Sequence, residues 1–289
     1  MPRFIRVPII SHSSIMTSWL KQGPAKKKEE VEKHFLFETS DTGFCAQFNA
    51  YLYAALYSEV EHIPLMVNDT VNAVSIRYPL IRNTFQPIPS ISFTDTNLLT
   101  AISLKKRRAL LMNSISAMKS VVMRNFGREL FQWNPSVVQT PTLDVSGIDV
   151  GVHLRTFQSN EGKNPTIEQY IKAIQSYQKT SKKTTLRVFV MTDSSQRLEE
   201  LIRKKDPSWT LKTISNPTNI TGHSQRDFNA SPSRIRMNAY MEFLAELQAM
   251  QKIPTIICTF SSNVGKFLYL STSNATNIVS IDEPAFAAF

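Results

Sequence analysis

The chain has 289 residues, of which 42% are apolar and 19% are charged. This length suits one large domain or two ordinary ones, with a core that needs no disulfides, and the composition is that of a globular rather than a disordered protein. No apolar run approaches the roughly 18 to 20 residues that a membrane span needs, so no membrane anchor is expected.

The formal net charge of +10 favours an anionic partner, which is a nucleic acid, a membrane surface or a phosphorylated small molecule. The densest basic runs, Lys26–Lys28 and Lys105–Arg108, are typical of solvated helix faces. A nucleic-acid-binding protein would combine basic residues with aromatic ones or contain a known module, and neither is seen. We therefore expect no nucleic-acid partner; steep salt dependence of oligonucleotide binding would favour that alternative instead.

The two cysteines, Cys45 and Cys258, lie in apolar neighbourhoods, and the sequence has no C-x-x-C motif and no Cys/His cluster with metal-ligand spacing. The apolar stretch near Met1 is short and is interrupted by proline and arginine, so no signal peptide is expected. These features fit a reducing compartment, so we expect a cytoplasmic protein without a bound metal.

The first half of the chain predicts helices and short strands. The spacing of apolar residues predicts a helix over residues 46–60, and residues 63–67 predict a strand. The proline-containing stretch 71–97 predicts loops and short pieces, and residues 98–130 predict a helix that Gly127 interrupts. Residues 135–147, rich in Pro, Thr and Ser, predict a linker, so we expect an N-terminal domain over 1–145 and a C-terminal domain over 146–289.

The second half predicts strands that alternate with helices. The strands are expected at residues 148–154, 186–191, 209–214 and 255–260. The helices are expected at residues 166–179, 195–204, 233–251 and 263–270. This alternation predicts a parallel α/β sheet, in which ligands bind at the carboxyl ends of the strands.

Polar residues follow three of these strands. His153 and Arg155 are two positions apart and point the same way, and arginine offers a forked donor to phosphate oxygens. Asp193 ends the next strand, and Ser261 and Ser262 open a helix, where hydroxyls, free amides and the helix dipole favour an anion. Each feature alone is more typical of a surface or capping residue. The three together, in chain order, predict a ligand that carries phosphate.

Three of these segments resemble motifs of the α1,6-fucosyltransferase family, which includes animal core fucosyltransferases and rhizobial nodulation fucosyltransferases. Residues 151–156 (GVHLRT) resemble its G-V-H-x-R-R-T-D segment, residues 189–193 (FVMTD) its strand ending in T-D, and residues 258–264 (CTFSSNV) its C-T-F-S-S-Q-V segment. Residues 43–47 (GFCAQ) resemble a Gly-aromatic-Gly-Cys-Gln turn of its first domain. The resemblance covers about residues 145–270 and, more loosely, 41–67.

The resemblance implies an α/β, GT-B-like fold, in which two Rossmann-type domains face a cleft. It also implies an inverting, metal-independent glycosyltransferase that moves fucose from GDP-fucose to a hydroxyl of an oligosaccharide or glycoprotein. No cofactor beyond the nucleotide-sugar donor is implied. For a glycosyltransferase in which no membrane anchor is expected, the setting would be the cytoplasm of a bacterium or, for a viral enzyme, of its host. The N-terminal domain would lie on the acceptor side, and the C-terminal domain would bind the donor.

The resemblance also implies roles for individual residues. Arg155 would bind the donor diphosphate and assist catalysis, and Glu246, placed by its spacing from Ser262, would read the guanine base, with Glu242 as the fallback. A solvated helix position is the alternative for both glutamates. The other residues expected at the donor site are His153, Tyr170, Asp193, Ser261, Ser262, Gly43 and Phe44.

The catalytic carboxylate is assigned by counting back from a second motif. Residues 166–170 (TIEQY) match the family's P-I-E-x-Y helix start, which places Glu161 at the position of the general base after a two-residue deletion. Glu168 is the second choice, although its place in the first helical turn suits a helix-dipole role better. A surface glutamate is the alternative for Glu161.

Two departures from the family's pattern affect the expected donor. Thr156 stands where the family has a second arginine, and Phe157 or Gln158 stands where it has an aspartate. In the family those positions help to bind and activate the fucosyl donor. A different donor such as UDP-xylose, which would make the chain a xylosyltransferase, and a non-enzymatic nucleotide- or glycan-binding module both stay open.

Overall fold

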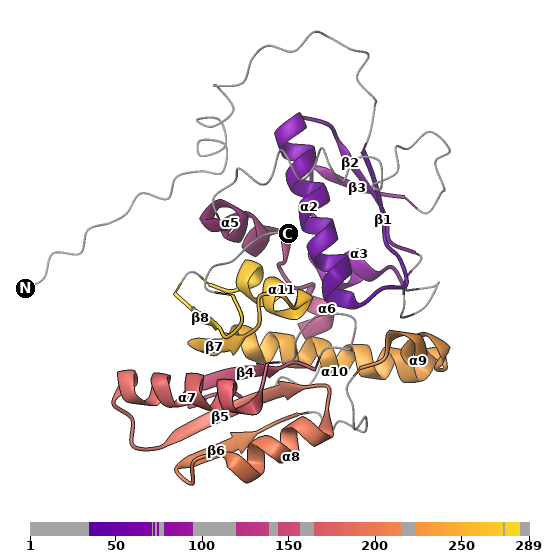
Figure 1. Ribbon diagram of the computed structural model, residues 1–289. Coiled ribbons are helices and arrows are strands. Elements are labelled where there is room, and N and C mark those ends of the chain that lie inside the picture. The colour runs from indigo at the N-terminus through magenta and orange to yellow at the C-terminus, as the bar shows by residue number, and fades with distance from the viewer. Residues whose placement is uncertain are drawn as a thin grey trace, which may run out of the picture.

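The computed structural model describes residues 35–70, 72, 74, 78–94, 120–138, 144–156, 165–214, 223–273 and 275–283. These residues form two parallel β-sheets with helices packed against them (Figure 1). The α/β class that the sequence predicts is therefore confirmed. Across these residues, no helix combines the length and the apolar character needed to cross a lipid bilayer.

The first sheet is parallel and has the strand order β1-β2-β3. Its strands are β1 (Phe35–Glu38), β2 (Leu65–Asn68) and β3 (Ile91–Phe93). The helices of this half are α2 (Phe44–Glu61), α3 (Leu80–Thr84), α5 (Ser120–Leu130) and α6 (Pro135–Val138). The predicted helix at 46–60 and strand at 63–67 are confirmed. The sequence missed β1, α3, β3 and α6, which begins the predicted linker 135–147, because elements of three to five residues are too short to show a period.

The second sheet is also parallel and has the order β6-β5-β4-β7-β8. Its strands are β4 (Val150–Leu154), β5 (Leu186–Thr192), β6 (Trp209–Lys212), β7 (Thr255–Cys258) and β8 (Asn277–Ser280). Its helices are α7 (Ile167–Ser181), α8 (Ser195–Lys204), α9 (Gln225–Ala230), α10 (Ser233–Gln251) and α11 (Asn263–Ser271). The predicted strands and helices are confirmed to within a few residues, and only α9 and β8 were missed.

Alternate residues of the central strand β4 point to opposite faces of the second sheet. Val150, Val152 and Leu154 pack in one core cluster with residues of α7 and α8. The other face carries Gly151, where an added Cβ would lie 2.7 Å from the Sδ atom of Met250 on α10. The lack of a side chain at residue 151 therefore lets α10 lie close against the sheet.

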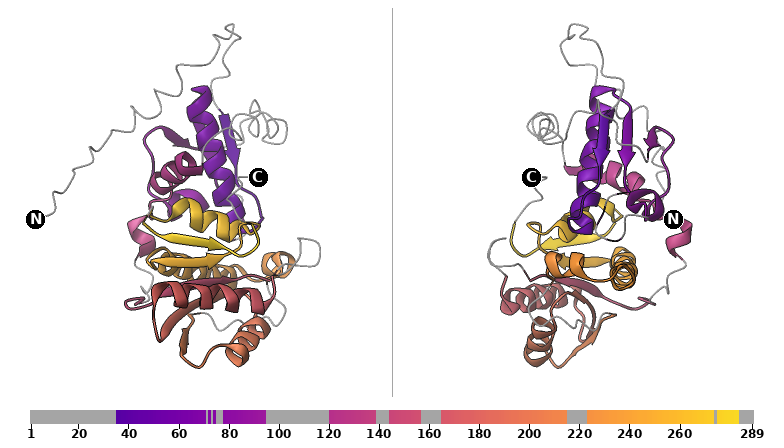
Figure 2. Two further views of the ribbon diagram at one scale, coloured as in Figure 1. Left: turned by 60° about the vertical axis from the view of Figure 1, so that its left-hand side comes forward. Right: turned by 90° about the vertical axis from the view of Figure 1, so that its right-hand side faces the viewer.

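Helix α11 joins the two halves of the chain. It lies between α2 and α10 in the views of Figures 1 and 2. The ring of Phe267 on α11 has its centroid 4.9 Å from that of Phe131, 5.4 Å from that of Phe48 and 6.3 Å from that of Phe85. The two halves thus share one buried aromatic cluster. The division into two domains at residue 145 stays a prediction.

The expected helix break at Gly127 is wrong. Gly127 lies inside α5, and a Cβ there would be 2.5 Å from the carbonyl oxygen of Leu270 and 2.8 Å from Cδ1 of Leu52. The glycine lets α5 cross the end of α11 at close range, so its role is in packing rather than in ending a helix. The expected helical residues 98–119 lie outside the described part of the chain.

The turn from β7 into α11 is the tightest close approach at a described glycine. A Cβ on Gly265 would lie 1.9 Å from the carbonyl oxygen of Thr259 and 3.4 Å from Sγ of Cys258. Since a backbone oxygen cannot move aside as a flexible side chain does, only glycine fits at this position.

We predict that Gly265→Ala lowers the free energy of unfolding by about 3 kcal/mol, because the methyl group forces α11 away from β7. A urea unfolding curve measures the effect. Gly43→Ala is the control, since its Cβ would meet only Oε1 of Gln225 at an ordinary 3.5 Å. It should cost no more than about 1 kcal/mol. Equal unfolding midpoints for Gly265→Ala and the wild type would contradict this reading of the turn.

Candidate functional site

The carboxyl ends of β4, β5 and β7 lie side by side at one edge of the second sheet. The register pairs Leu154 with Thr192, and β7 runs along the other side of β4. Helices begin soon after each strand, with Thr166 capping α7, Ser194 capping α8 and Ser262 capping α11. Three helix N-termini, each a partial positive charge, therefore meet at this edge of the sheet.

Arg155 and Asp193 form the central contact of this edge. The guanidinium Nη1 of Arg155 donates to Oδ2 of Asp193 at 2.7 Å, and both side chains are about one-fifth exposed. The backbone amide of His223 donates to the same oxygen at 3.2 Å. The amide of Arg155 donates to the hydroxyl of the buried Tyr170 at 3.2 Å. The structure thus brings Arg155, Tyr170 and Asp193 together, as the sequence predicts.

His153 lies beneath Arg155 as a buried, neutral side chain. It is 5% exposed, and its Nδ1 has no hydrogen-bond partner. Burial, reinforced by the positive charge of Arg155, lowers the pKa of His153 to about 3. At neutral pH His153 therefore offers a hydrogen bond but no charge, and the fixed positive charge here comes from Arg155.

Four buried polar atoms at this edge have no hydrogen-bond partner. They are Nδ1 of His153, Oγ1 of Thr156, Oδ1 of Asp193 and Oγ1 of Thr259. A buried polar atom left without a partner costs about 1–3 kcal/mol, so native proteins contain few of them. All four belong to residues at or just beyond the ends of β4, β5 and β7, so this edge of the sheet is a place where a polar ligand could supply hydrogen bonds.

The two serines after β7 have different roles. Ser262 is 3% exposed and caps α11, where its Oγ accepts from the amide of Val264 at 3.2 Å. Ser261 is exposed, and its hydroxyl and its amide both donate to the carboxylate of Asp282. Of the two predicted phosphate-binding serines, Ser262 therefore caps the helix, whereas the hydroxyl of Ser261 is bound to Asp282.

The N-terminal half reaches this edge through the start of α2. Cys45 lies close enough to Arg155 for the guanidinium charge to oppose the rise that burial causes in the pKa of the thiol. One helical turn later, Nδ2 of Asn49 donates to the carbonyl oxygen of Asn263 on α11 at 3.0 Å. Gly43 begins α2 and lies next to Gln225. The predicted contribution of residues 43–47 thus lies near the strand ends.

The side chain of Phe44 packs among aromatic rings of the second half of the chain. Its ring centroid lies 4.5 Å from that of Tyr240, 5.5 Å from that of Phe228 and 5.7 Å from that of Phe243. The aromatic contacts link α2 to α9 and α10. The contacts that the structure gives Phe44 are therefore with apolar rings of the second half.

A chain of hydrogen bonds through α9 connects the two halves, and the sequence did not reveal it. Nε2 of His223 lies 3.2 Å from Oε1 of Gln225, and Nε2 of Gln225 donates to the carbonyl oxygen of Asp41 at 3.1 Å. Asn229 donates to the same carbonyl oxygen at 3.1 Å. The available signal was Ser224, which caps α9 in front of Asp227.

Exposure distinguishes the two glutamates that the sequence suggests for recognition of the base. Glu242 is exposed, whereas Glu246 is 5% exposed. Glu246 lies one turn before Met250, the residue that covers Gly151, and α10 runs opposite to the strands. Glu246 is therefore about 6 Å nearer the carboxyl end of β4 than Met250 is. The geometry favours Glu246 over the fallback.

Of the two candidates for the general base, Glu161 and Glu168, the structure describes only Glu168. Glu161 lies outside the described residues, as do Phe157 and Gln158. Glu168 is a surface residue whose carboxylate pairs with Lys204. The hydrogen bond from Lys204 lowers the pKa of Glu168 to about 2, which makes its carboxylate a weak proton acceptor. Glu168 thus has a structural role at the start of α7.

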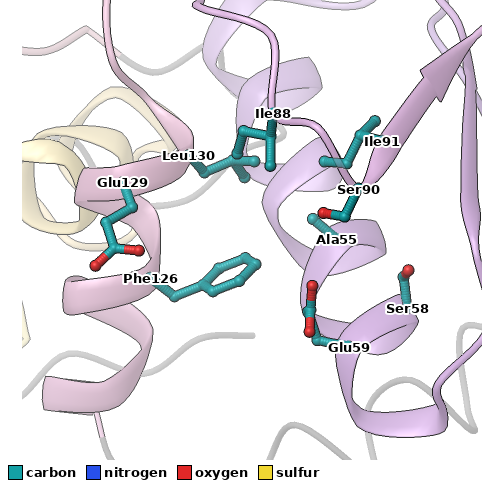
Figure 3. A pocket seen from close by; sticks show the side chains of 9 residues that line it. All are labelled: Ala55, Ser58, Glu59, Ile88, Ser90, Ile91, Phe126, Glu129 and Leu130. Carbon is teal, nitrogen blue, oxygen red and sulfur yellow. The ribbon is translucent and has the colours of Figure 1, made fainter. Parts of the chain in front are cut away.

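Two cavities lie away from the strand ends. A cavity of about 220 Å³ separates α2 from α5, and the ring of Phe126 projects into it between Glu59 and Glu129 (Figure 3). A more open one of about 480 Å³ lies at the opposite edge of the second sheet, beside Asp149 and Lys183. Within the described ranges, no three His, Cys, Asp or Glu side chains are grouped to hold a metal ion.

Two parallel sheets with helices packed against them share one core, and this arrangement is that of a GT-B-like α/β fold. The fucosyltransferase NodZ from Bradyrhizobium superposes with a TM-score of 0.52 over 88% of this chain and 97% of its own, at 12% identity. NodZ α-1,6-fucosyltransferase soaked with GDP-fucose gives 0.50 over 84% and 93%, also at 12% identity. No protein-family profile and no curated protein matches the sequence. The fold expected from the sequence motifs is confirmed.

We predict that His153 makes the protein sensitive to acid. Because the pKa of His153 is about 3 in the folded chain and 6.5 in the unfolded one, only the unfolded chain takes up this proton between those values. Stability should therefore fall by up to about 1.4 kcal/mol for each pH unit below 6.5. Urea unfolding from pH 7 to pH 4 measures the loss.

His153→Gln should remove that part of the pH dependence. The control is His62→Asn, which removes an exposed histidine at the end of α2 and should keep the wild-type profile. Identical acid sensitivity in His153→Gln and the wild type would show that His153 is not buried in its neutral form.

Proposed function

We propose that this chain is a glycosyltransferase that takes a sugar from a nucleotide sugar and transfers it to a hydroxyl of an oligosaccharide or glycoprotein. The observation that carries the proposal is that four unpartnered polar atoms and the ion pair of Arg155 with Asp193 occur at the carboxyl ends of three neighbouring parallel strands. The similarity of the fold to a fucosyltransferase soaked with GDP-fucose supports it. GDP-fucose is the first choice of donor, and a cytoplasmic setting is part of the proposal.

The chain's own groups suit the departure of a nucleoside diphosphate. The guanidinium of Arg155 is held by Asp193, and the backbone amide of Arg155 donates to the hydroxyl of Tyr170, so both the side chain and its backbone are ordered before phosphate oxygens arrive. The N-terminus of α11, capped by Ser262, adds amide donors and a positive dipole end. Such preorganised donors stabilise the negative charge that develops on a leaving diphosphate without a metal ion.

We propose that the reaction inverts the anomeric centre in one step. A carboxylate removes the proton from the acceptor hydroxyl while that oxygen attacks the anomeric carbon and the diphosphate leaves. Glu161 is the proposed general base, from its place between β4 and α7 in the sequence. The ion pair of Glu168 with Lys204 supports Glu161 over that second choice.

The donor sugar has a second candidate, which one residue favours. Thr156 takes the place of an arginine, and its buried Oγ1 has no partner. A hydroxyl there is smaller than a guanidinium and carries no charge, so the pocket near the sugar differs from that of a fucosyl donor site. A UDP-pentose such as UDP-xylose is therefore the alternative donor, with the same fold and the same leaving group.

Two variants separate binding from chemistry. Arg155→Ala should weaken GDP binding by about 1.5–3 kcal/mol, which is the contribution of a charge-assisted contact. Glu161→Gln should lower kcat by about 10²–10⁴ and leave GDP binding nearly unchanged, because only the proton transfer is lost. Calorimetry with GDP and a transfer assay with the preferred donor measure the two effects.

Arg203→Ala is the matched control for charge, since Arg203 is exposed on α8, away from the strand ends. It should bind GDP as the wild type does. Unchanged GDP affinity in Arg155→Ala would remove Arg155 from the donor site. A wild-type kcat in Glu161→Gln would leave the base unassigned, and no transfer or donor hydrolysis by the wild type would favour the non-enzymatic binding module.

The nucleobase preference tests the role of Glu246. If its carboxylate accepts from N1 and N2 of guanine, GDP should bind more tightly than UDP, and Glu246→Ala should remove the difference. Glu242→Ala, which alters an exposed residue one turn earlier, should keep it. A wild-type chain that prefers UDP would replace GDP-fucose with a UDP-sugar such as UDP-xylose.

A further inference from the structure

Asp282 makes an unusually dense set of hydrogen bonds just beyond the second sheet. Its Oδ1 accepts from the amide of Phe260 at 2.8 Å, from the hydroxyl of Ser280 at 2.6 Å and from the amide of Glu283 at 2.9 Å. Its Oδ2 accepts from the amide of Ser261 at 3.2 Å and from the hydroxyl of Ser261. One carboxylate therefore binds two consecutive amides of the loop between β7 and α11.

The position of Asp282 shows which side of that loop it holds. It follows the edge strand β8, and the amide of Ile281 still pairs with the carbonyl oxygen of Cys258 at 3.0 Å. In the strand order, β8 and β4 lie on opposite sides of β7. Asp282 thus binds the loop from the outer edge of the sheet, two strands away from the strand that carries Arg155.

The charge of Asp282 suits this task. Partial burial on its own would raise the pKa of the carboxyl, but the hydrogen bonds from Ser261, Ser280 and the two loop amides lower it overall. Asp282 is therefore ionised at neutral pH, when charge-assisted hydrogen bonds from amides and hydroxyls are strongest. The bonds leave the cap of α11 untouched, because Ser262 accepts from Val264 and not from the loop amides.

We propose that Asp282 is a positioning residue that holds the loop from Thr259 to Ser262, so that Ser262 and the first turn of α11 face the diphosphate beside Arg155. The inference rests on the proposed function for its ligand. It also assigns the hydroxyl of Ser261 to Asp282 rather than to the donor. Gly265 brings α11 against the loop, and Asp282 fixes the loop from the other side.

The test compares GDP with guanosine, which has no phosphates. In Asp282→Asn, an amide NH₂ replaces one acceptor oxygen and faces hydrogen-bond donors, so the loop loses its anchor. GDP should bind about tenfold more weakly, the scale of one charge-assisted hydrogen bond, while guanosine binds within about twofold of the wild type. Because loss of stability alone would weaken both ligands equally, the ratio of the two affinities reports on positioning.

Asp206→Asn is the matched control. Oδ1 of Asp206 also accepts from a serine amide at 2.8 Å and from its hydroxyl at 2.7 Å, before β6 at the other end of the sheet. This variant should change neither affinity. Equal affinities of Asp282→Asn and the wild type for GDP would overturn the proposal. Tighter GDP binding would also overturn it, since Asp282 would then be competing with phosphate.

Amide hydrogen exchange distinguishes failure of this inference from failure of the proposed function. The amides of Phe260 and Ser261 should exchange faster in Asp282→Asn than in the wild type, with no nucleotide added. Unchanged exchange would show that Asp282 does not hold the loop, whatever GDP does. A wild-type chain that binds no GDP would instead remove the proposed function and the phosphate role of the loop, even if exchange is faster.

Discussion

The close approach of Gly265 to the carbonyl oxygen of Thr259 is the constraint on which the rest of the arrangement depends. It lets α11 begin directly against the end of β7, with Ser262 as its cap. Any side chain at residue 265 would tilt the helix away from the sheet. The N-terminus of α11 would then no longer lie beside the strand that carries Arg155.

The same helix determines how the two halves of the chain meet. The ring of Phe267 packs against Phe48 and Phe131, and Gly127 lets α5 cross the last turn of α11. A shift of α11 would therefore disturb the proposed anion-binding end and the shared core together. This coupling accounts for the two close approaches of α11, at Gly265 near its start and against Gly127 of α5 near its end.

Charge at the strand ends is concentrated in few groups. His153 is neutral, and the charge of Arg155 is partly offset by its ion pair with Asp193. Burial makes each remaining polar contact stronger, and it leaves four polar atoms without partners. The chain's net charge of +10 is therefore a poor guide to this site, because the decisive features are the orientation of one guanidinium and of helix ends.

The sequence by itself determined the order of strands and helices in the second half, and the polar residues at the strand ends. Those features are local: apolar periodicity defines α7, α8 and α10, and a residue that follows a strand is visible as such. Arg155, Asp193 and Ser262 were found in this way. The resemblance in residues 258–264 extended the prediction to the fold of the whole chain.

Only the tertiary structure decided the contacts between segments that are distant in the sequence. From the sequence alone Gly127 suggests a helix break, whereas in the structure Leu270 lies against it. Ser261 and Ser262 look equivalent in the sequence, but in the structure only the hydroxyl of Ser261 donates to Asp282. Glu246 and Glu242 likewise differ only once α10 is packed on the sheet. The physical reason is common to all three: a residue's role here depends on what packs against it, and no local pattern records a neighbour that lies tens or hundreds of residues away in the sequence.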